Sequence, residues 1–192
     1  MKPSNRDKLL AQGMRVVHEL GYSGASVRDI ARAADVPLSS FTSHFASKEA
    51  YCLEILELYY LSTVSLIGRT LRNDALAPLQ RLRDYFDRHE NVIEANGVEH
   101  GCLMGNFSVE SAAHSETIRL RLTAMFADIE NAIAYALDAA VAAGELAAIA
   151  DSAGLAAYLV ASFQGAILRS KVEHNPVHLQ RYKELLFSRI LT

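Results

Sequence analysis

Apolar residues recur at intervals of three and four along most of the chain, the spacing that places them on one face of an α-helix. Near the start they include Leu9, Leu10, Met14, Val17 and Leu20. No segment shows the strict alternation of apolar and polar residues that marks a half-buried strand. The pattern therefore predicts an all-α protein.

Helix ends are marked most clearly in residues 1–48. Ser4 is followed by Asp7, and Ser26 by Asp29, at the spacing of a capping box, in which a hydroxyl and an acid satisfy free amides at a helix start. Gly21 can adopt the left-handed conformation that ends a helix. We therefore expect one helix between Ser4 and Gly21 and a second one from Ser26.

Two short helices follow the first one. The second helix is expected to run through Ala33, and a third from about Pro37 to Ser43, because proline suits the first turn of a helix. A long fourth helix is expected from about Lys48 to Leu71. Two short helices joined by a tight turn and supported by longer ones form a helix-turn-helix. The sequence thus predicts a three-helix head of this kind.

The remaining chain is predicted to form a larger helical body. Helices are expected over residues 78–94, 116–143, 151–173 and 175–191, and the short segment GCLMGNFSVE lies between the first two. With the head and the fourth helix, this makes about nine helices. The body contains no glycine-rich phosphate loop and no nucleophile elbow, so we expect no cofactor. His174 and His178 are separated by Asn175-Pro176 and need not share a helix face, so no metal site is expected.

Charge is distributed unevenly along the chain. Residues 1–48 carry seven basic and four acidic residues, a net +3, and the remainder carries 12 basic and 18 acidic residues, a net −6. A small basic head on an acidic body suits a DNA-binding module with a separate regulatory part. No apolar run of about 18 residues occurs, so no membrane partner is expected. The first residues lack the apolar core of a signal peptide, which predicts a cytoplasmic protein.

The stretch from Leu9 to Glu49 resembles the DNA-reading head of the TetR family. GYSGASVRDIARAADVP, followed by SSFTSHFASKEA, matches that family's Gly-aromatic pair, its Ile-Ala-x-x-Ala-x-Val helix and its Phe-x-x-Phe-x-Ser-Lys-Glu segment. Further on, GCLMGN and GAILRSK are similar to the NemR-like branch, whose members respond to reactive small molecules. The resemblance implies a DNA-binding domain at residues 1–48 and an effector-binding and dimerisation domain at residues 49–192.

The function that this resemblance implies is a ligand- or redox-responsive transcriptional repressor and not an enzyme. Such a protein binds a palindromic double-stranded DNA operator as a homodimer and is released by a small molecule or electrophile. Two heads about 34 Å apart would read the two halves of the palindrome. An effector that moves the fourth helix would change the separation of the heads and weaken operator binding.

The third helix is expected to lie in the major groove, with the second helix and the start of the fourth on the DNA backbone. The expected DNA contacts are Ser26, Arg28, Leu38, Ser39, Ser40, Thr42, Ser43, His44 and Lys48. Lys48 matches the family's phosphate anchor, but Thr42 stands where a tyrosine is usual and Leu38 where a lysine is frequent. The alternative for Ser39, Ser40 and Ser43 is plain solvated surface. Phe41 and Phe45 are assigned to the core of the head.

The last two helices offer two stripes for a dimer interface. Gly154, Ala157, Ala161 and Gly165 recur every three or four residues, so a neighbouring helix can approach closely. A matching stripe on the last helix consists of Leu179, Tyr182 and Leu186. The alternative is that both stripes pack within one chain.

The body also contains a candidate sensor. Cys102 lies at the start of a short segment, where helix amides favour a thiolate, and Lys171 stands where the similar branch carries a lysine. If the two meet, Cys102 is a candidate sensor of oxidants or electrophiles. The alternative is that Cys102 is a small buried residue and Lys171 a surface charge. Cys52 is assigned to core packing; neither cysteine has metal or CxxC spacing.

A non-covalent pocket is the other possibility for the effector. Its candidate lining consists of Tyr59, Phe86, Phe107, Met125, Phe126, Phe163 and Gln164, with plain core packing as the alternative. Such a pocket would suit a small, largely apolar effector.

Two different functions remain open at this point. The first is a thiol-dependent helical oxidoreductase that works through Cys102, for which only Cys52 is available as a resolving cysteine. The second is a helical interaction protein whose head no longer binds DNA, an alternative left open by the nearly uncharged third helix.

Overall fold

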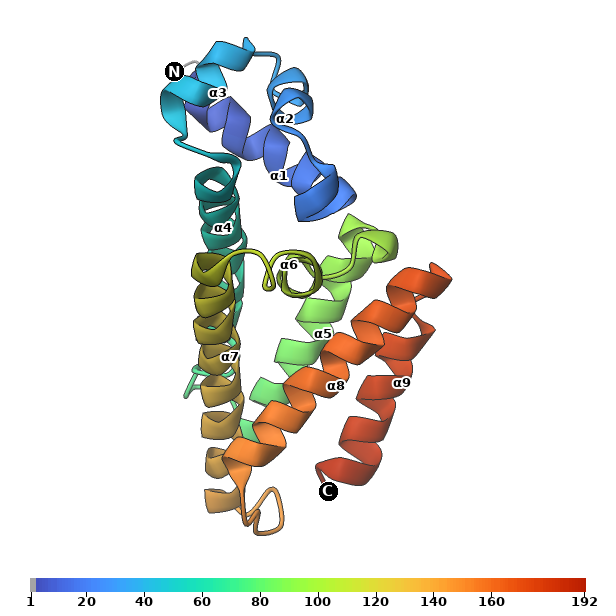
Figure 1. Ribbon diagram of the computed structural model, residues 1–192. Helices are drawn as coiled ribbons and strands as arrows, with labels where there is room; N and C mark the ends of the chain where they lie inside the picture. Colours follow the sequence, from blue (N-terminus) through green and yellow to red (C-terminus); the bar gives the residue numbers. More distant parts are fainter. Residues whose placement is uncertain (1–2) are drawn as a thin grey trace. The chain divides into compact units, whose positions relative to one another are not determined.

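The structure is a computed structural model, and it describes residues 3–192. Within this range it contains nine α-helices and no strand, which confirms the predicted all-α fold (Figure 1). The helices are α1 (Asn5–Gly24), α2 (Val27–Ala33), α3 (Leu38–His44), α4 (Lys48–Arg69), α5 (Pro78–Asn96), α6 (Leu103–Glu110), α7 (Glu116–Ala142), α8 (Ser152–Glu173) and α9 (Val177–Leu185). A 3-10 turn, η1 (Val98–His100), precedes α6, and a π-helical turn, η2 (Leu186–Ile190), follows α9.

The chain divides into two compact units. The first comprises the residues up to Leu61 together with Leu103–Leu122, and the second comprises Ser62–Cys102 and Thr123–Thr192. The divisions fall inside α4 and α7, so each of these helices contributes to both units. The first unit contains the helix-turn-helix formed by α1, α2 and α3.

The core of the first unit is organised around Tyr51 of α4. Its hydroxyl donates a hydrogen bond to the carbonyl of Leu9 over 2.7 Å, and its ring packs against those of Phe41 and Phe45. Gly13 leaves the space for this hydroxyl, because a Cβ at position 13 would collide with the Tyr51 side chain. Phe41 and Phe45 are buried, as the sequence predicts.

The sequence signals for helix ends are found where they were expected. Ser4 and Ser26 each form a complete capping box, with Asp7 and Asp29 respectively. Asp151 caps α8 through the amide of Gly154. The chain leaves helical geometry at the predicted position, Gly21, whose φ is 76°, but further helical turns follow as far as Gly24.

α6 packs against the end of α1 within the first unit. Glu110, the last residue of α6, accepts a hydrogen bond from the backbone N–H of Ser23 over 3.0 Å. A side chain at Gly21 would collide with the Glu110 carboxylate, so the glycine serves both the positive φ and this close approach. The end of α1 is therefore shaped to receive a carboxylate from α6.

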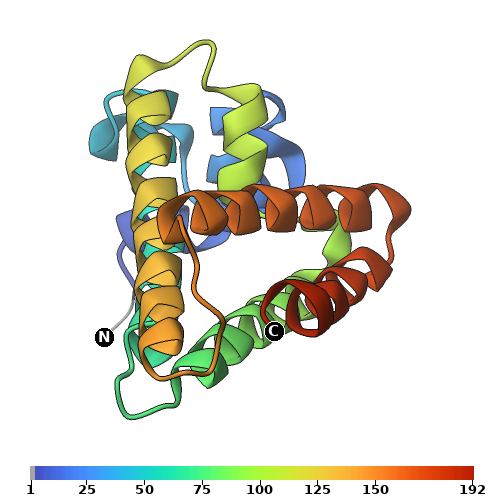
Figure 2. The ribbon, with the colours of Figure 1, turned by 90° about the horizontal axis from the view of Figure 1, so that it is seen from below.

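In the second unit, α8 packs against α9 (Figure 2). Aromatic side chains of α5 meet those of these two helices. The ring of Phe86 lies 5.2 Å from that of Phe163 and 5.5 Å from that of Tyr182. Such edge-on and tilted pairs are the preferred geometries of aromatic rings in protein cores.

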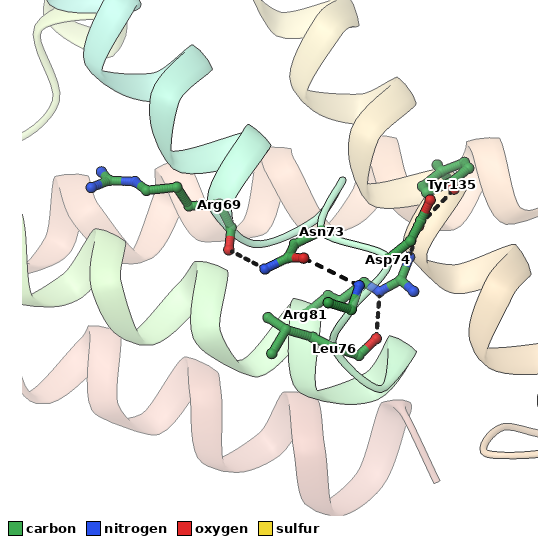
Figure 3. Close-up of polar contacts among 7 residues, drawn as sticks. Arg69, Asn73, Asp74, Leu76, Arg81 and Tyr135 are labelled. Carbon is green, nitrogen blue, oxygen red and sulfur yellow. Dashed lines mark hydrogen bonds and ion pairs between the residues drawn. The ribbon is translucent and has the colours of Figure 1, made fainter.

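A buried arginine fixes the corner between α4 and α5 (Figure 3). The Arg81 guanidinium donates to the carbonyl of Leu76 over 2.9 Å and to the carboxylate of Asp74 over 2.6 Å. Tyr135 of α7 donates its hydroxyl to the same carboxylate, and the guanidinium of Arg72 lies over the Tyr135 ring. These contacts join the corner to both α5 and α7.

α4 is long and apolar enough to cross a membrane, by length and composition only. A core helix passes the same test, so one such helix is weak evidence. Tyr51, Cys52, Ile55 and Leu56 of α4 are fully buried within the first unit, as expected for a core helix.

Candidate DNA-binding face and ligand cavity

Most of the expected DNA contacts are solvent-exposed on α2 and α3. The exposed residues are Arg28, Leu38, Ser39, Thr42, Ser43 and His44. Leu38 leaves 43% of its surface exposed, a large value for an apolar side chain at the start of a helix. A thymine methyl group offers an apolar partner of this kind in the major groove.

Two of the exposed hydroxyls are already committed as donors. Thr42 and Ser43 both donate to the carbonyl of Ser39, over 3.1 Å and 2.7 Å. A hydroxyl that has donated its hydrogen can still accept one. In this arrangement the two side chains suit the amino groups of bases, because phosphate oxygens only accept hydrogen bonds.

The structure differs from the expectation at Ser26 and Ser40. The Ser26 hydroxyl donates to the Asp29 carboxylate over 2.5 Å, so the chain's own acid occupies the expected phosphate clamp. These hydrogen bonds from Ser26 lower the pKa of Asp29, which keeps a negative charge at that helix start. Ser40 is half-buried, and its hydroxyl accepts a hydrogen bond from the Asn5 side chain over 3.1 Å. Both serines therefore help to hold the head together.

Lys48 has an aromatic partner that the sequence patterns did not reveal. Its ammonium lies over the ring of Tyr22, 5.0 Å from the centroid, and the Tyr22 ring meets that of Phe107 edge-on at 5.7 Å. Burial raises the pKa of the Tyr22 hydroxyl. The aromatic residue next to Gly21 was visible in the sequence, but the pairing with Lys48 depends on where α4 begins. Tyr22 thus positions the expected phosphate anchor.

The two stripes expected at a dimer interface have different environments. On α8, Ala161 and Gly165 are exposed. Apart from the adjoining residues and backbone of α8 itself, no described atom lies within 4 Å of a Cβ built at Gly165. On α9, Leu179 and its neighbour along the stripe, Leu186 of η2, are fully buried within this chain. The stripe of the last helix therefore packs inward, because its apolar face covers the core of its own unit.

Two further residues of these stripes also contact their own chain. Tyr182 is half-buried and donates its hydroxyl to the carbonyl of Leu159 over 2.9 Å, and Ala157 is half-buried. The exposed face of α8 is completed by larger apolar residues that the helical spacing alone did not single out. They are Tyr158, Leu168 and Val172, exposed at 57%, 56% and 68%. With Ala161 and Gly165 they form a continuous apolar face, which we call the α8 stripe.

Cys102 is a buried free thiol directly before α6. Its Sγ lies 3.6 Å from Nε2 of Gln164 on α8. The side chain of Lys171 runs beside the neighbouring residue, because a Cβ built at Gly101 would lie 3.1 Å from Lys171 Cδ. The Lys171 ammonium donates to the carbonyl of His100 over 3.5 Å. The structure thus brings Lys171 to the segment that carries Cys102. Cys52, in contrast, is fully buried in the first unit, and burial raises its pKa to about 12.

A small cavity lies between three helices of the second unit. α5 contributes Tyr85, Phe86 and His89, α7 contributes Ile129 and Ile133, and α8 contributes Val160, Phe163 and Gln164. Its free volume is about 10 Å³, close to the space for one water molecule. Three of the expected pocket residues, Phe86, Phe163 and Gln164, meet there, and His89 was not anticipated.

The other expected pocket residues lie elsewhere. Tyr59 packs edge-on against His18, and Phe107 packs against Tyr22, both in the first unit. Met125 is fully buried and Phe126 half-buried on α7, and neither lines the cavity. Phe107 and Met125 are therefore buried core residues, whereas Tyr59 and Phe126 are half-buried.

Within residues 3–192, no group of three or more His, Cys, Asp or Glu side chains is placed to hold a metal ion. His178 instead pairs with the Glu173 carboxylate over 2.8 Å. His174 adopts a left-handed conformation at the end of α8. His174 therefore forms the end of a helix, and His178 is the partner of an acidic side chain.

Two protein-family models match this chain. A family model described as "Bacterial regulatory proteins, tetR family" matches residues 9–55, and one described as "Tetracyclin repressor-like, C-terminal domain" matches residues 78–186. Together the two matches cover the helix-turn-helix and most of the remaining helices.

Individual relatives extend along nearly the whole chain. The HTH-type transcriptional repressor DhaR of Mycobacterium sp. strain GP1 is 34% identical over 97% of this chain and 92% of its own length. The crystal structure of a regulatory protein TetR from Rhodobacter sphaeroides has a TM-score of 0.89 and 32% identity, covering 97% of this chain and 98% of that one. The repressor NemR of Escherichia coli is 29% identical over 59% of this chain and 57% of its own length.

Proposed function

Because this chain belongs to the TetR family of bacterial regulatory proteins, we propose that it is a transcriptional repressor that a small molecule or an electrophile releases from its operator. We assign residues 1–48 to DNA binding and residues 49–192 to effector binding and dimerisation. The exposed face of α3, flanked by Arg28 and Lys48, is the observation that carries this proposal. The relative DhaR is a transcriptional repressor, which supports repression and not activation as the function of this chain.

The DNA-binding mode follows from the character of the α3 face. Leu38, Thr42 and Ser43 offer an apolar contact and hydrogen-bond acceptors to base edges, and positive charge comes from the flanking Arg28 and Lys48. Base contacts give sequence specificity, and charge contacts with phosphates give affinity. The affinity of the repressor for DNA therefore depends on a few basic side chains, and it decreases as the salt concentration rises.

The α8 stripe is our candidate for the homodimer interface. An exposed apolar face on one helix, with Ala161 and Gly165 at its centre, allows a second copy of the same helix to approach closely. A symmetric pair of chains presents two heads to the two halves of a palindromic operator. Burial of Leu168 and Val172 in this contact would remove their apolar surface from water.

Cys102 and Lys171 are the candidate sensor of electrophiles or oxidants. Lys171 supplies a positive charge next to the segment that holds the thiol. Modification of a buried thiol requires space that the present packing does not offer. The added group therefore displaces neighbouring residues, starting with Gln164.

Two elements carry such a displacement towards the DNA. α6 begins directly after Cys102 and ends at Glu110, which is bonded to the end of α1, and α4 runs from the head to the Arg81 corner. A difference of about 1–3 kcal/mol between the bound and released conformations weakens operator binding about 5–150-fold. We place this repressor in the cytoplasm, where DNA and a reducing environment are found.

The test is selection of random duplex DNA by the purified protein, followed by affinity titration of the selected sequence at a fixed salt concentration. An enriched palindrome bound by two chains supports the repressor. Weaker binding after diamide treatment, abolished by Cys102→Ser, supports the thiol sensor. Failure to enrich any sequence contradicts the proposed function, and peroxide turnover that depends on Cys102 would favour the oxidoreductase instead.

A further inference from the structure

One side chain that lines the cavity between α5, α7 and α8, His89, carries a polar atom that the fold leaves without a partner. His89 Nδ1 is buried and has no hydrogen-bond partner among the described residues. Its ring packs edge-on against Tyr85 and Phe163, at centroid distances of 5.7 Å and 5.2 Å. An unpaired buried polar atom is destabilising, and the large majority of such atoms in folded proteins are paired. An unpaired nitrogen on a side chain of the cavity wall therefore indicates a binding site for a guest ligand that can form a hydrogen bond.

The cavity wall determines the charge of that guest. Burial lowers the pKa of His89 to about 4, so its imidazole is neutral at physiological pH. Within the part of the chain that the structure describes, no Asp, Glu, Lys or Arg side chain lines the cavity. A carboxylate or an ammonium group would lose its hydration there without gaining an opposite charge. The guest is therefore uncharged.

The cavity also limits the shape of its guest. Apart from His89 and Gln164, the wall is aromatic or aliphatic, with one further hydroxyl on Tyr85. The free volume of about 10 Å³ accommodates a single oxygen atom, so the carbon part of a guest displaces a ring such as Phe163. A compact molecule of few carbon atoms requires the least displacement.

We propose that this cavity binds a small uncharged molecule with an apolar body and one hydroxyl or carbonyl oxygen, which hydrogen-bonds to His89 Nδ1 and the Gln164 side-chain amide. The proposal rests on the proposed function in that it names the chemical class of the reversible effector. A neutral imidazole nitrogen either donates or accepts according to its tautomer, and an amide does both. The two side chains therefore suit both hydroxyl and carbonyl guests.

Gln164 connects this guest to the thiol. The same amide lines the cavity and lies 3.6 Å from Cys102 Sγ. A guest that bonds to Gln164 changes the contact between the amide and the sulfur. Reversible binding in the cavity consequently alters the reactivity of Cys102, and one side chain serves both responses.

The experiment uses the full chain, labelled with ¹⁵N in its histidines, and 1-butanol as the probe. We expect a saturable shift of the His89 imidazole signals with 1-butanol and none with equal concentrations of butanoate or butylammonium. The variant His89→Phe keeps an aromatic ring among Tyr85 and Phe163. The shift of protein methyl signals measures the affinity of this variant for 1-butanol. We expect this affinity to be at least about fivefold weaker, because the loss of one hydrogen bond changes affinity by about this factor.

A second measurement does not depend on that variant. The rate of Cys102 alkylation by iodoacetamide, followed by mass spectrometry, should change at least about threefold with saturating 1-butanol, whereas that of the buried Cys52 stays constant. Equal binding of butanoate, or unchanged affinity in a folded His89→Phe variant, would overturn the proposal. DNA is absent from both measurements. If the chain binds 1-butanol at His89 but selects no operator, the cavity proposal stands and the proposed repressor function is contradicted. If it selects an operator but does not bind 1-butanol at His89, only the cavity proposal is contradicted.

Discussion

The carboxylate of Glu110 accepts the backbone N–H of Ser23 over 3.0 Å, and this contact ties the end of α6 to the end of α1. Gly21 makes room for it, because any Cβ at that position would meet the same carboxylate. The ends of these two helices are thus held together by one acid and one glycine.

We expect Gly21→Ala to lower the free energy of unfolding by about 1–3 kcal/mol, since the variant combines a strained positive φ with a collision. Urea denaturation followed by circular dichroism measures it. Glu110→Ala removes the collision partner, so the double variant should lose less stability than the sum of the single variants. Simple additivity would show that the two residues do not interact.

Operator binding should depend on Arg28 and Lys48. Each change to alanine should weaken the affinity for the selected palindrome about 5–10-fold and reduce the slope of log affinity against log salt by about one for each phosphate that is no longer neutralised. Fluorescence anisotropy at several salt concentrations measures both quantities. Arg181→Ala is the matched control, because it removes an exposed charge from α9. An equal reduction with Arg181→Ala would attribute the effect to net charge alone.

The α8 stripe should control the association of two chains. Leu168→Glu places a carboxylate in an apolar contact and should produce a monomer with at least about tenfold weaker operator binding, as an uncompensated buried charge costs several kcal/mol. Sedimentation equilibrium gives the mass. Val92→Glu on α5, which is exposed to a similar degree, provides the control. A dimeric Leu168→Glu protein would place the interface elsewhere.

Stability should depend on pH through His89. The unfolded histidine titrates near 6.5 and the folded one near 4, so between these values only the unfolded chain binds the proton. The free energy of unfolding therefore falls as the pH decreases from 6.5 to 4, by up to about 3 kcal/mol from this group. Well above pH 6.5, where the histidine is neutral in both states, the group contributes no pH dependence.

His89→Phe should remove this part of the pH dependence. Urea unfolding of both proteins at about pH 7.5 and about pH 4.5 measures it, because the other titrating groups contribute equally to both. Tyr85 is the other titratable side chain in the cavity wall, and both proteins retain it. The same pH dependence in both proteins would show that His89 is solvated in the folded state.

The Arg81 corner allows a test of a buried charge. The Arg81 side chain is 7% exposed and its partner Asp74 is 70% exposed, so most of the desolvation falls on the arginine. Asp74→Ala should destabilise the fold by about 1–3 kcal/mol by leaving the guanidinium with fewer partners. Arg81→Met in the same chain should restore part of this stability. Thermal unfolding of the unchanged protein, Asp74→Ala and the double variant measures these differences. A further decrease of stability in the double variant would contradict this explanation.

Much of the fold was predictable because its signals are local. Ser4 with Asp7 and Ser26 with Asp29 satisfy amides only three residues away, and such contacts form wherever a helix starts. Leu179 and Leu186 pack within their own chain, the alternative that the sequence left open, because periodicity identifies an apolar face but not the partner that covers it. Helical spacing also places His89 four residues after the buried Tyr85, on the same face of α5, and this signal was available in the sequence.

The partners of Ser40 and Lys48 needed the fold itself. Asn5 reaches Ser40 across 35 residues of sequence, and Tyr22 meets Lys48 only because α1 and α4 pack in one unit. Contacts of this kind leave no periodic trace in the sequence. The helix that carries the candidate site and its exposed residues could therefore be predicted from the sequence, but not the hydrogen bonds that its hydroxyls already make.

The division of the chain inside α4 affects how its specificity could be transplanted. Tyr51 lies beyond residue 48, yet its hydroxyl and ring complete the packing of α1 and α3. A chimera joined at residue 48 would build the grafted head around a foreign side chain at this position. Exchange of operator preference between relatives should therefore succeed when the graft extends to Leu61 and brings α6, with Glu110, from the same donor. Recombination that takes the head and α6 from different relatives would yield folded bodies with poorly packed heads.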